Sequence, residues 1–218
     1  MFAALIDDRR RLTFRWGGVR AADAAERLLV LGVYLALVAR LVVHASQTGK
    51  WANLLLLASE GLVVVFLVLR RPATQITGDW REWAVALAAT LAPLLVRPAS
   101  EGETARAAFG ALLLSTGMVV QVNAKLALGR SFGCVPAHRG LQLAGPYRFV
   151  RHPMYAGYLL SHAAFLFMNP SPWNAAVYAV CYALQIPRIF AEERLLARDP
   201  RYRQYQQTVR YRLIPGVF

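Results

Sequence analysis

Cysteine, histidine and acidic residues are scarce in this 218-residue sequence. Its two cysteines, Cys134 and Cys181, are far apart, and no Cys-x-x-Cys pair or Cys/His ligand spacing accompanies them. The sequence therefore indicates neither a disulfide framework nor a metal site. Charged residues make up only 17% of the chain against 57% hydrophobic residues. This balance excludes disorder and most classes of soluble enzyme.

The charge that is present is mostly of one sign. Lysine and arginine total 25 against 12 acidic residues, a net charge of +13. Residues 125–218 hold twelve of the basic residues and three of the acidic ones, so nine of the thirteen net positive charges lie there. On so apolar a chain, this excess indicates a bilayer with an anionic face more than it indicates nucleic acid.

Six apolar stretches approach the 20 or so residues that a helix needs to cross about 30 Å of hydrocarbon. They are Arg27–Ala45, Trp51–Leu69, Trp83–Val96, Thr104–Leu128, Met154–Met168 and Trp173–Phe190. We therefore predict an all-α fold, a polytopic integral membrane helical bundle of about six transmembrane helices. The third stretch is short and contains Pro93, so it is the weakest of the six.

The loops between these stretches indicate an orientation. If the N-terminus is cytoplasmic, the loops on the outer side hold only Lys50, Arg97 and Arg106, and all other loop arginines face inward. We therefore predict a multi-pass protein with both termini in the cytoplasm and with residues 1–20 as a retained arm. Arg40 and Glu60 fall inside spans, where we expect a structural ion pair rather than a catalytic role.

A polar stretch interrupts the apolar pattern at the predicted cytoplasmic end of two spans. Gly145-Pro146 is typical of a turn, and Pro153 suits the first turn of a helix, whose free N–H groups attract anions. Tyr147 and Tyr155 add flat surfaces suited to an adenine or ribose. Further on, Arg188 and Glu192 share one helix face, a spacing that also fits a simple surface salt bridge.

An antiparallel hairpin of the last two spans brings these groups together. Its turn at Asn169-Pro170 would place Arg188 and Glu192 beside Tyr147 and His152. A cation, a carboxylate, a histidine and an anion-binding helix start at the membrane surface make a plausible site for a zwitterionic, nucleotide-like cofactor.

The ordered set of motifs resembles the isoprenylcysteine carboxyl methyltransferase family and its phospholipid methyltransferase relatives over roughly residues 125–218. The motifs are Gly145-x-Tyr147-x-x-x-Arg151-His152-Pro153-x-Tyr155-x-Gly157, Asn169-Pro170, Arg188-x-x-x-Glu192-Glu193, Tyr202-x-x-Tyr205-x-x-x-Val209 and Ile214-Pro215. The first three spans carry no such resemblance. On this division, 1–124 hold the N-terminal arm and four helices, and 125–218 form a methyltransferase core with a helix hairpin and an amphipathic tail, all within one structural domain.

The resemblance implies an integral membrane methyltransferase that uses S-adenosyl-L-methionine in a C-terminal pocket open to the cytosol. The cofactor-lining residues it implies are Arg139, Gly140, Leu141, Gln142, Tyr147, His152, Pro153, Met154, Tyr155 and Glu192. Arg188 corresponds to the family's substrate-contacting arginine, so Arg188 and Glu192 are the expected catalytic pair. Two departures are Arg139-Gly140, where eukaryotic members carry a polar His-Thr type pair, and Pro146 directly after Gly145.

The sequence leaves the acceptor open. Carboxyl O-methylation of an S-isoprenylcysteine-type substrate needs no general base, because a carboxylate is already ionised. N- or S-methylation of a phospholipid or small lipophilic amine or thiol would need one, with His152 or Glu192 as candidates. An NADPH-dependent membrane sterol reductase and a non-catalytic scaffold are further alternatives.

The expected partners are the bilayer and a lipophilic acceptor, without nucleic acid. In the tail, Tyr202, Tyr205 and Tyr211 alternate with arginines, a mixture that also suits single-stranded nucleic acid. Next to a membrane, such a segment more often lies on anionic headgroups.

Overall fold

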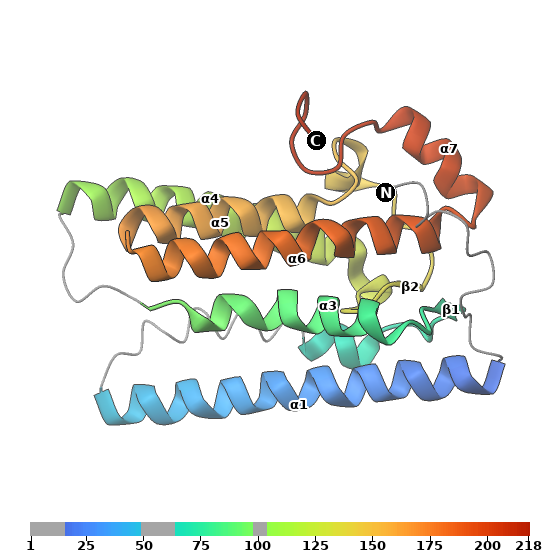
Figure 1. Ribbon diagram of the computed structural model, residues 1–218, viewed down its shortest axis with the longest axis horizontal. Coiled ribbons are helices and arrows are strands. Elements are labelled where there is room, and N and C mark those ends of the chain that lie inside the picture. Colours follow the sequence, from blue (N-terminus) through green and yellow to red (C-terminus); the bar gives the residue numbers. More distant parts are fainter. Residues whose placement is uncertain (1–15, 49–63, 98–103) are drawn as a thin grey trace.

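The protein is mostly helical in the computed structural model, which describes residues 16–48, 64–97 and 104–218 (Figure 1). The helices are α1 (Trp16–Thr48), α3 (Trp80–Leu91), α4 (Thr104–Leu128), α5 (Pro153–Met168), α6 (Pro172–Leu196) and α7 (Pro200–Thr208), and residues 64–69 are also helical. Short 3₁₀ turns cover Ala92–Leu95, Gly129–Ser131 and Gly145–Arg148. The two strands, β1 (Gln75–Ile76) and β2 (Ala137–His138), form a small antiparallel pair.

The predicted apolar stretches are helical wherever the structure describes them, except at Val96, which is extended. Arg27–Ala45 lies inside the longer α1, and Thr104–Leu128 has the same bounds as α4. The last two stretches correspond to α5 and α6, and α6 continues through Pro187 to Leu196. The second stretch falls largely outside the described residues, as does the expected pair of Arg40 with Glu60.

In the part of the chain that it describes, the structure supports fewer membrane-crossing helices than the sequence predicts. Among the described residues, one helical stretch, Ala108–Ser131, is both long and apolar enough to cross a bilayer. The third predicted stretch is divided between α3 and a 3₁₀ turn that contains Pro93. The 12 residues of α3 extend about 18 Å, less than the hydrocarbon thickness, because an α-helix rises 1.5 Å per residue.

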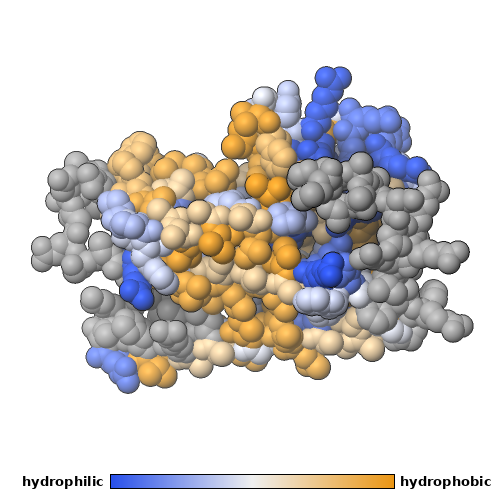
Figure 2. All heavy atoms as spheres, viewed as in Figure 1, coloured by the Kyte–Doolittle hydropathy of each residue, from blue (hydrophilic) through white to orange (hydrophobic). Residues whose placement is uncertain are grey.

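The long helices run roughly parallel to one another in Figure 1, with α4, α5 and α6 on one side and α1 on the other. α4 packs most extensively on α5, and α3 packs on α6. Large apolar side chains on several helices are exposed, including Leu28 on α1, Leu112 on α4 and Val180 on α6. Hydrophobic residues cover the middle of the face seen in Figure 2, and hydrophilic residues gather near α7 and the C-terminus. This distribution is typical of a bundle with an apolar belt and one polar end.

The β1–β2 pair fixes a loop at that polar end. Gln75 lies opposite His138 and Ile76 opposite Ala137. The pairing is extended by backbone bonds from Thr74 N to His138 O (2.8 Å) and from Thr77 N to Pro136 O (3.1 Å). The segment that follows α4 is therefore anchored to the segment that precedes α3.

The contact of α4 with α5 depends on glycine. A Cβ atom at Gly157 would lie 2.6 Å from the backbone nitrogen of Gln121 and 2.9 Å from the carbonyl oxygen of Gly117. A Cβ at Gly117 would in turn lie 2.4 Å from the Oγ of Ser161. The glycine that ends the His-Pro-x-Tyr-x-Gly motif is therefore required by close helix packing, a role common at helix contacts in membranes.

We predict that Gly157→Ala destabilises the protein by about 1–3 kcal/mol, because the new methyl group forces the two backbones apart. The measurement is the apparent Tm of detergent-purified protein, which should fall by several degrees. Gly32→Ala is the matched control, since nothing lies within 4 Å of a Cβ there and alanine favours a helix more than glycine. Equal Tm values for the two variants would contradict this account of the α4–α5 contact.

Candidate functional site

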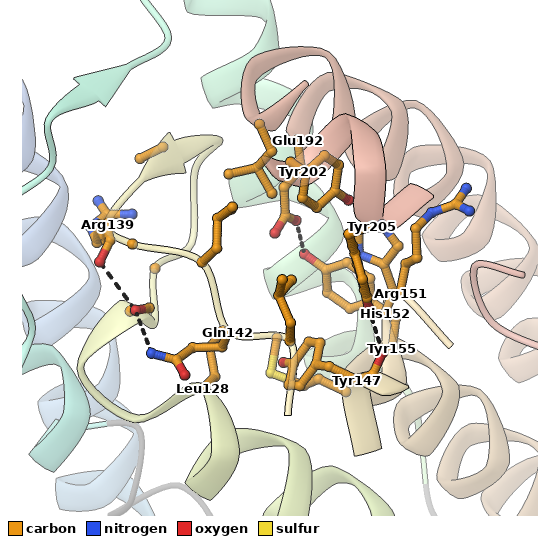
Figure 3. A pocket seen from close by; sticks show the side chains of 18 of the residues that line it. Leu128, Arg139, Gln142, Tyr147, Arg151, His152, Tyr155, Glu192, Tyr202 and Tyr205 are labelled. Atoms are coloured by element: carbon orange, nitrogen blue, oxygen red, sulfur yellow. Dashed lines mark hydrogen bonds between the residues drawn. The ribbon is translucent and has the colours of Figure 1, made fainter. Parts of the chain in front are cut away.

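A recess opens at the polar end of the bundle, between the start of α5, the end of α6 and α7 (Figure 3). It encloses about 680 Å³ of space, its open mouth included. The predicted cofactor residues that line it are Arg139, Gly140, Leu141, Gln142, Tyr147, His152, Met154, Tyr155 and Glu192. Pro153 does not line it and is buried in the first turn of α5. The structure thus brings together residues from three separate parts of the sequence.

Glu192 places a half-buried carboxylate in this recess. The hydroxyl of Tyr155 donates a hydrogen bond to its Oε2 at 3.1 Å (Figure 3). The Tyr155 ring stacks on the His152 ring, with centroids 5.5 Å apart and planes 11° apart. The recess therefore brings Glu192, Tyr147 and His152 together, whereas Arg188, which we expected beside them, does not line it.

Two tyrosines of α7, Tyr202 and Tyr205, complete the recess, and our site prediction did not include them. Tyr205 donates from its hydroxyl to the carbonyl oxygen of Tyr147 at 2.5 Å. Burial raises the pKa of Tyr147 well above its usual value and raises the pKa of Tyr205 to about 12. Both phenols are therefore neutral at physiological pH. The Tyr-x-x-Tyr spacing was the sequence signal for them, because it puts both rings on one side of a helix.

A buried ionic cluster centred on Glu193 holds the wall beside the recess. The Nε of Arg151 donates to Glu193 Oε1 at 2.6 Å, and the Nε of Arg212 donates to Oε2 at 2.9 Å. His152 Nε2 lies 3.2 Å from Oε1. Arg151 also donates to the carbonyl oxygens of residues 209 and 210, both at 2.7 Å. Glu193, not predicted as a site residue, thus ties the start of α5 and the C-terminal segment to the end of α6.

The C-terminal segment also caps the start of α5. The backbone N–H groups of Arg151 and His152 donate to the carbonyl oxygens of Tyr211 (2.9 Å) and Arg212 (2.8 Å). These N–H groups directly precede the helix start that we expected to hold an anion. The chain's own tail therefore satisfies them.

Arg139 has a different partner from the one expected. It lines the recess, but its guanidinium group is buried and pairs with Asp23 (2.8 Å) and Glu26 of α1. Its charge is therefore already balanced within the protein. The next residue, Gly140, has φ +97°, a left-handed conformation that favours glycine. This explains why a glycine stands at one of the two positions that depart from the family pattern.

Arg188 is buried close to the recess but does not line it. Its guanidinium carbon lies 5.2 Å from the centre of the Tyr155 ring, and Nη2 donates to the carbonyl oxygen of Cys134 at 2.7 Å. Nη1 donates to Thr90 Oγ1 at 3.2 Å. Within the described residues, Arg188 and Glu192 form no ion pair with each other, because each has turned to a separate partner. The surface salt bridge that their spacing also allowed is therefore not formed.

Comparison with known proteins finds one family model, described as phospholipid methyltransferase, that matches residues 105–203. A curated relative, protein-S-isoprenylcysteine O-methyltransferase A of Arabidopsis thaliana, is 33% identical over 89 residues. That alignment covers 38% of this chain and 43% of the Arabidopsis protein, so the similarity spans less than half of each.

Among solved structures, that of the eukaryotic intramembrane Ras methyltransferase, an isoprenylcysteine carboxyl methyltransferase, matches with a TM-score of 0.46 and 18% identity. The match covers 88% of this chain and 75% of the solved chain. The resemblance that the motifs predict is confirmed by the family model and by the Arabidopsis relative. The family match begins at residue 105, within α4, and ends at residue 203, so it takes in most of that helix and the expected segment except its last 15 residues, 204–218.

We predict that Glu193→Gln lowers the apparent Tm at neutral pH and that the deficit disappears in acid. Burial alone would raise the pKa of Glu193, but hydrogen bonds and charge from His152 and Arg151 outweigh it and lower the pKa from 4.5 to about 2. The ionised carboxylate therefore stabilises the fold above pH 4.5, by an amount on the order of 3 kcal/mol, and this is lost as the pH falls towards 2.

The measurement is a series of Tm values between pH 7 and pH 2 for the wild type and the variant. Glu82→Gln is the control, because Glu82 pairs with the exposed Arg194 and such a pair contributes under about 1 kcal/mol. A difference between wild type and Glu193→Gln that is as large at pH 2 as at pH 7 would contradict the predicted ionisation.

Proposed function

We propose that this chain is an integral membrane methyltransferase that transfers the methyl group of S-adenosyl-L-methionine to a lipophilic acceptor. We further propose that the reaction is carboxyl O-methylation of an S-isoprenylcysteine-type substrate. The observation that carries the proposal is the recess, which gathers the residues of the family motifs around the carboxylate of Glu192. The match of residues 105–203 to the phospholipid methyltransferase model supports the same class of chemistry.

The residues of the recess suit this cofactor. S-adenosyl-L-methionine carries two positive groups, a carboxylate and an adenosine, and when bound it supplies an electrophilic methyl group. Glu192 offers a carboxylate for a positive group, and the neutral rings of Tyr147 and Tyr205 offer flat surfaces for adenine. In our proposal the remaining lining residues shape the pocket and exclude water.

The charges of the residues that line the recess favour S-adenosyl-L-methionine over a dinucleotide phosphate as the cofactor. Binding NADPH would call for arginines that are available to phosphate groups. The two arginines that line the recess, Arg139 and Arg151, are instead paired with buried carboxylates of α1 and α6. This pairing favours the methyltransferase over the sterol reductase alternative.

Arg188 is proposed to orient the acceptor. Its Nε is buried and has no hydrogen-bond partner within the described residues, so one donor is left for a carboxylate. Methyl transfer is an in-line displacement, and the protein contributes chiefly by aligning the acceptor and by keeping water out. A carboxylate acceptor is ionised at neutral pH, so no residue has to remove a proton.

A groove between α5 and α6 is proposed to hold the acceptor's hydrocarbon tail. It spans about 530 Å³ of space, the open solvent at its mouth included, and is lined by Leu159, His162, Ala163, Leu166, Ala175, Tyr178, Ala179 and Tyr182. A series of rings leads towards it from the recess, from Tyr155 to Tyr158 (centroids 6.4 Å apart) and on to His162 (6.2 Å). From Tyr155 to His162 this path runs about 10 Å along α5, on the scale of a prenyl chain.

Membrane placement completes the proposal. We propose that about six segments cross the bilayer, with both termini in the cytoplasm, supported by the apolar stretch of α4 and by the exposed apolar side chains of the bundle. The tail's arginines would then face anionic headgroups. On α7, Arg201 and Arg203 are exposed, whereas Tyr202 and Tyr205 are buried against the recess.

The phospholipid methyltransferase match keeps a second acceptor class open, a lipid amine or a lipophilic thiol. Such an acceptor needs a base. Because His152 Nε2 already lies 3.2 Å from Glu193, Glu192 is the better candidate for that role. Comparison of a prenylcysteine acceptor with a phospholipid amine acceptor in the same methyl transfer assay separates the two.

We predict that Glu192→Gln weakens S-adenosylhomocysteine binding by about tenfold or more, because a charge-assisted contact is lost. Arg188→Ala should bind this product with nearly wild-type affinity but lose about 100-fold or more in turnover, because the acceptor is misplaced. Calorimetric titration of detergent-purified protein measures the first effect. A radiolabelled methyl transfer assay with an isoprenylcysteine acceptor measures the second.

Arg194→Ala is the matched control on the same helix, because Arg194 is exposed and pairs only with Glu82 among the described residues. Loss of cofactor-product binding in Arg188→Ala, with turnover intact in Glu192→Gln, would reverse the two assigned roles. Binding of NADPH in place of S-adenosylhomocysteine would refute the methyltransferase itself.

A further inference from the structure

The loop of residues 133–139 connects the recess to Arg188. Gly133, Val135 and Arg139 line the recess. Between them, the carbonyl oxygen of Cys134 accepts the 2.7 Å hydrogen bond from Arg188 Nη2. A shift of the backbone at Cys134 therefore moves the support of the proposed acceptor-binding arginine.

Glu26 of α1 holds this loop by its backbone. Its Oε1 accepts hydrogen bonds from the backbone N–H groups of Cys134 (2.5 Å) and Val135 (3.1 Å). The Glu26 side chain is fully buried. A carboxylate that accepts two N–H groups of consecutive residues fixes both the position and the direction of that backbone.

The other oxygen of Glu26 is balanced by two arginines. Oε2 pairs with Arg70 at 3.0 Å and with Arg139, and both arginines also pair with Asp23. Two carboxylates and two guanidinium groups thus form a neutral buried cluster. Within such a cluster, the paired charges offset the free energy of burying a carboxylate in the apolar bundle. Removal of one member leaves a buried charge without its partner.

We infer that Glu26 is a positioning residue for Arg188 and acts through the backbone of Cys134. This inference rests on the proposed function, because it assigns Arg188 to the acceptor. Glu26, Asp23 and Arg70 all lie outside residues 105–203, so the N-terminal part of the chain contributes to the site although the family model does not match it.

Asp23 provides a matched control. It is buried next to Glu26 on the same helix and pairs with the same two arginines. In the described residues no hydrogen bond joins it to the backbone of residues 134 and 135, whose N–H groups donate to Glu26. Asp23→Asn therefore removes a comparable buried charge and weakens the same pair with Arg139, but leaves the hydrogen bonds of Glu26 to the loop backbone in place.

The test compares Glu26→Gln with Asp23→Asn in the full-length protein. A glutamine at position 26 must turn its NH₂ group towards either the arginines or the backbone N–H groups, so it cannot serve both sides. Both variants should lose several degrees in Tm. Glu26→Gln should also raise the KM for an isoprenylcysteine acceptor about tenfold, with S-adenosylhomocysteine affinity within about twofold. Asp23→Asn should leave both constants within about twofold.

A double-mutant cycle with Arg188→Lys shows whether the effect passes through Arg188. We expect Glu26→Gln to add little in the Arg188→Lys background, because coupled residues are not additive. If the effects of Glu26→Gln and Arg188→Lys on the acceptor KM simply multiply in the double variant, the inference is overturned. It is also overturned if Glu26→Gln and Asp23→Asn lose equally in acceptor kinetics. If Glu26→Gln does not bind S-adenosylhomocysteine, Glu26→Asp repeats the test, because it keeps the charge and loses the reach to the loop.

The outcome for the wild type separates this inference from the proposed function. Wild-type protein that methylates no acceptor refutes the proposed function. If the wild type methylates the acceptor, and neither Glu26→Gln nor Glu26→Asp changes its kinetic constants, only the role of Glu26 is refuted.

Discussion

At the polar end of the bundle, two buried carboxylates hold together segments that lie far apart in the sequence. Glu193 gathers Arg151, His152 and Arg212, and so joins α5, α6 and the C-terminal segment. Glu26 gathers Arg70, Arg139 and the backbone after α4, and so joins α1 to the wall of the recess. A buried charge must be paired and hydrogen-bonded, and this requirement determines where each segment lies.

These pairs change the meaning of the chain's basic excess. Counted along the sequence, the arginines near the recess suggest a site for an anion. In the folded chain Arg139 and Arg151 are neutralised by acidic residues, and Glu192 retains a carboxylate in the recess. The recess therefore suits a cofactor with positive groups, while exposed arginines such as Arg201 remain on the outside of α7.

The helices and the lining of the recess could largely be predicted from the sequence. Apolar runs marked α4, α5 and α6, and the predicted hairpin placed Glu192 near Tyr147 and His152, which line the same recess. The role of Gly157 was not predictable, because a glycine in a motif does not show which backbone approaches it.

The ion pairs of the buried carboxylates could not be predicted from the sequence for a related reason. Arg139 and Glu26 are more than a hundred positions apart, and nothing local in either segment marks them as a pair. Glu193 was not predicted because Glu192 is its neighbour in the sequence. Adjacent helix positions point about 100° apart, so only one of the two could face the recess. In both cases the information lies in packing between distant segments.

The most direct test is of our central proposal, that this protein transfers a methyl group to a lipophilic acceptor. Membranes that contain the protein, and matched membranes that lack it, can be incubated with S-adenosyl-L-methionine carrying a deuterated methyl group, and the lipid extract can be surveyed by mass spectrometry. The account predicts a labelled methyl ester on an isoprenylcysteine-type compound, present only with the protein. A survey in which no lipophilic product gains the label would contradict it.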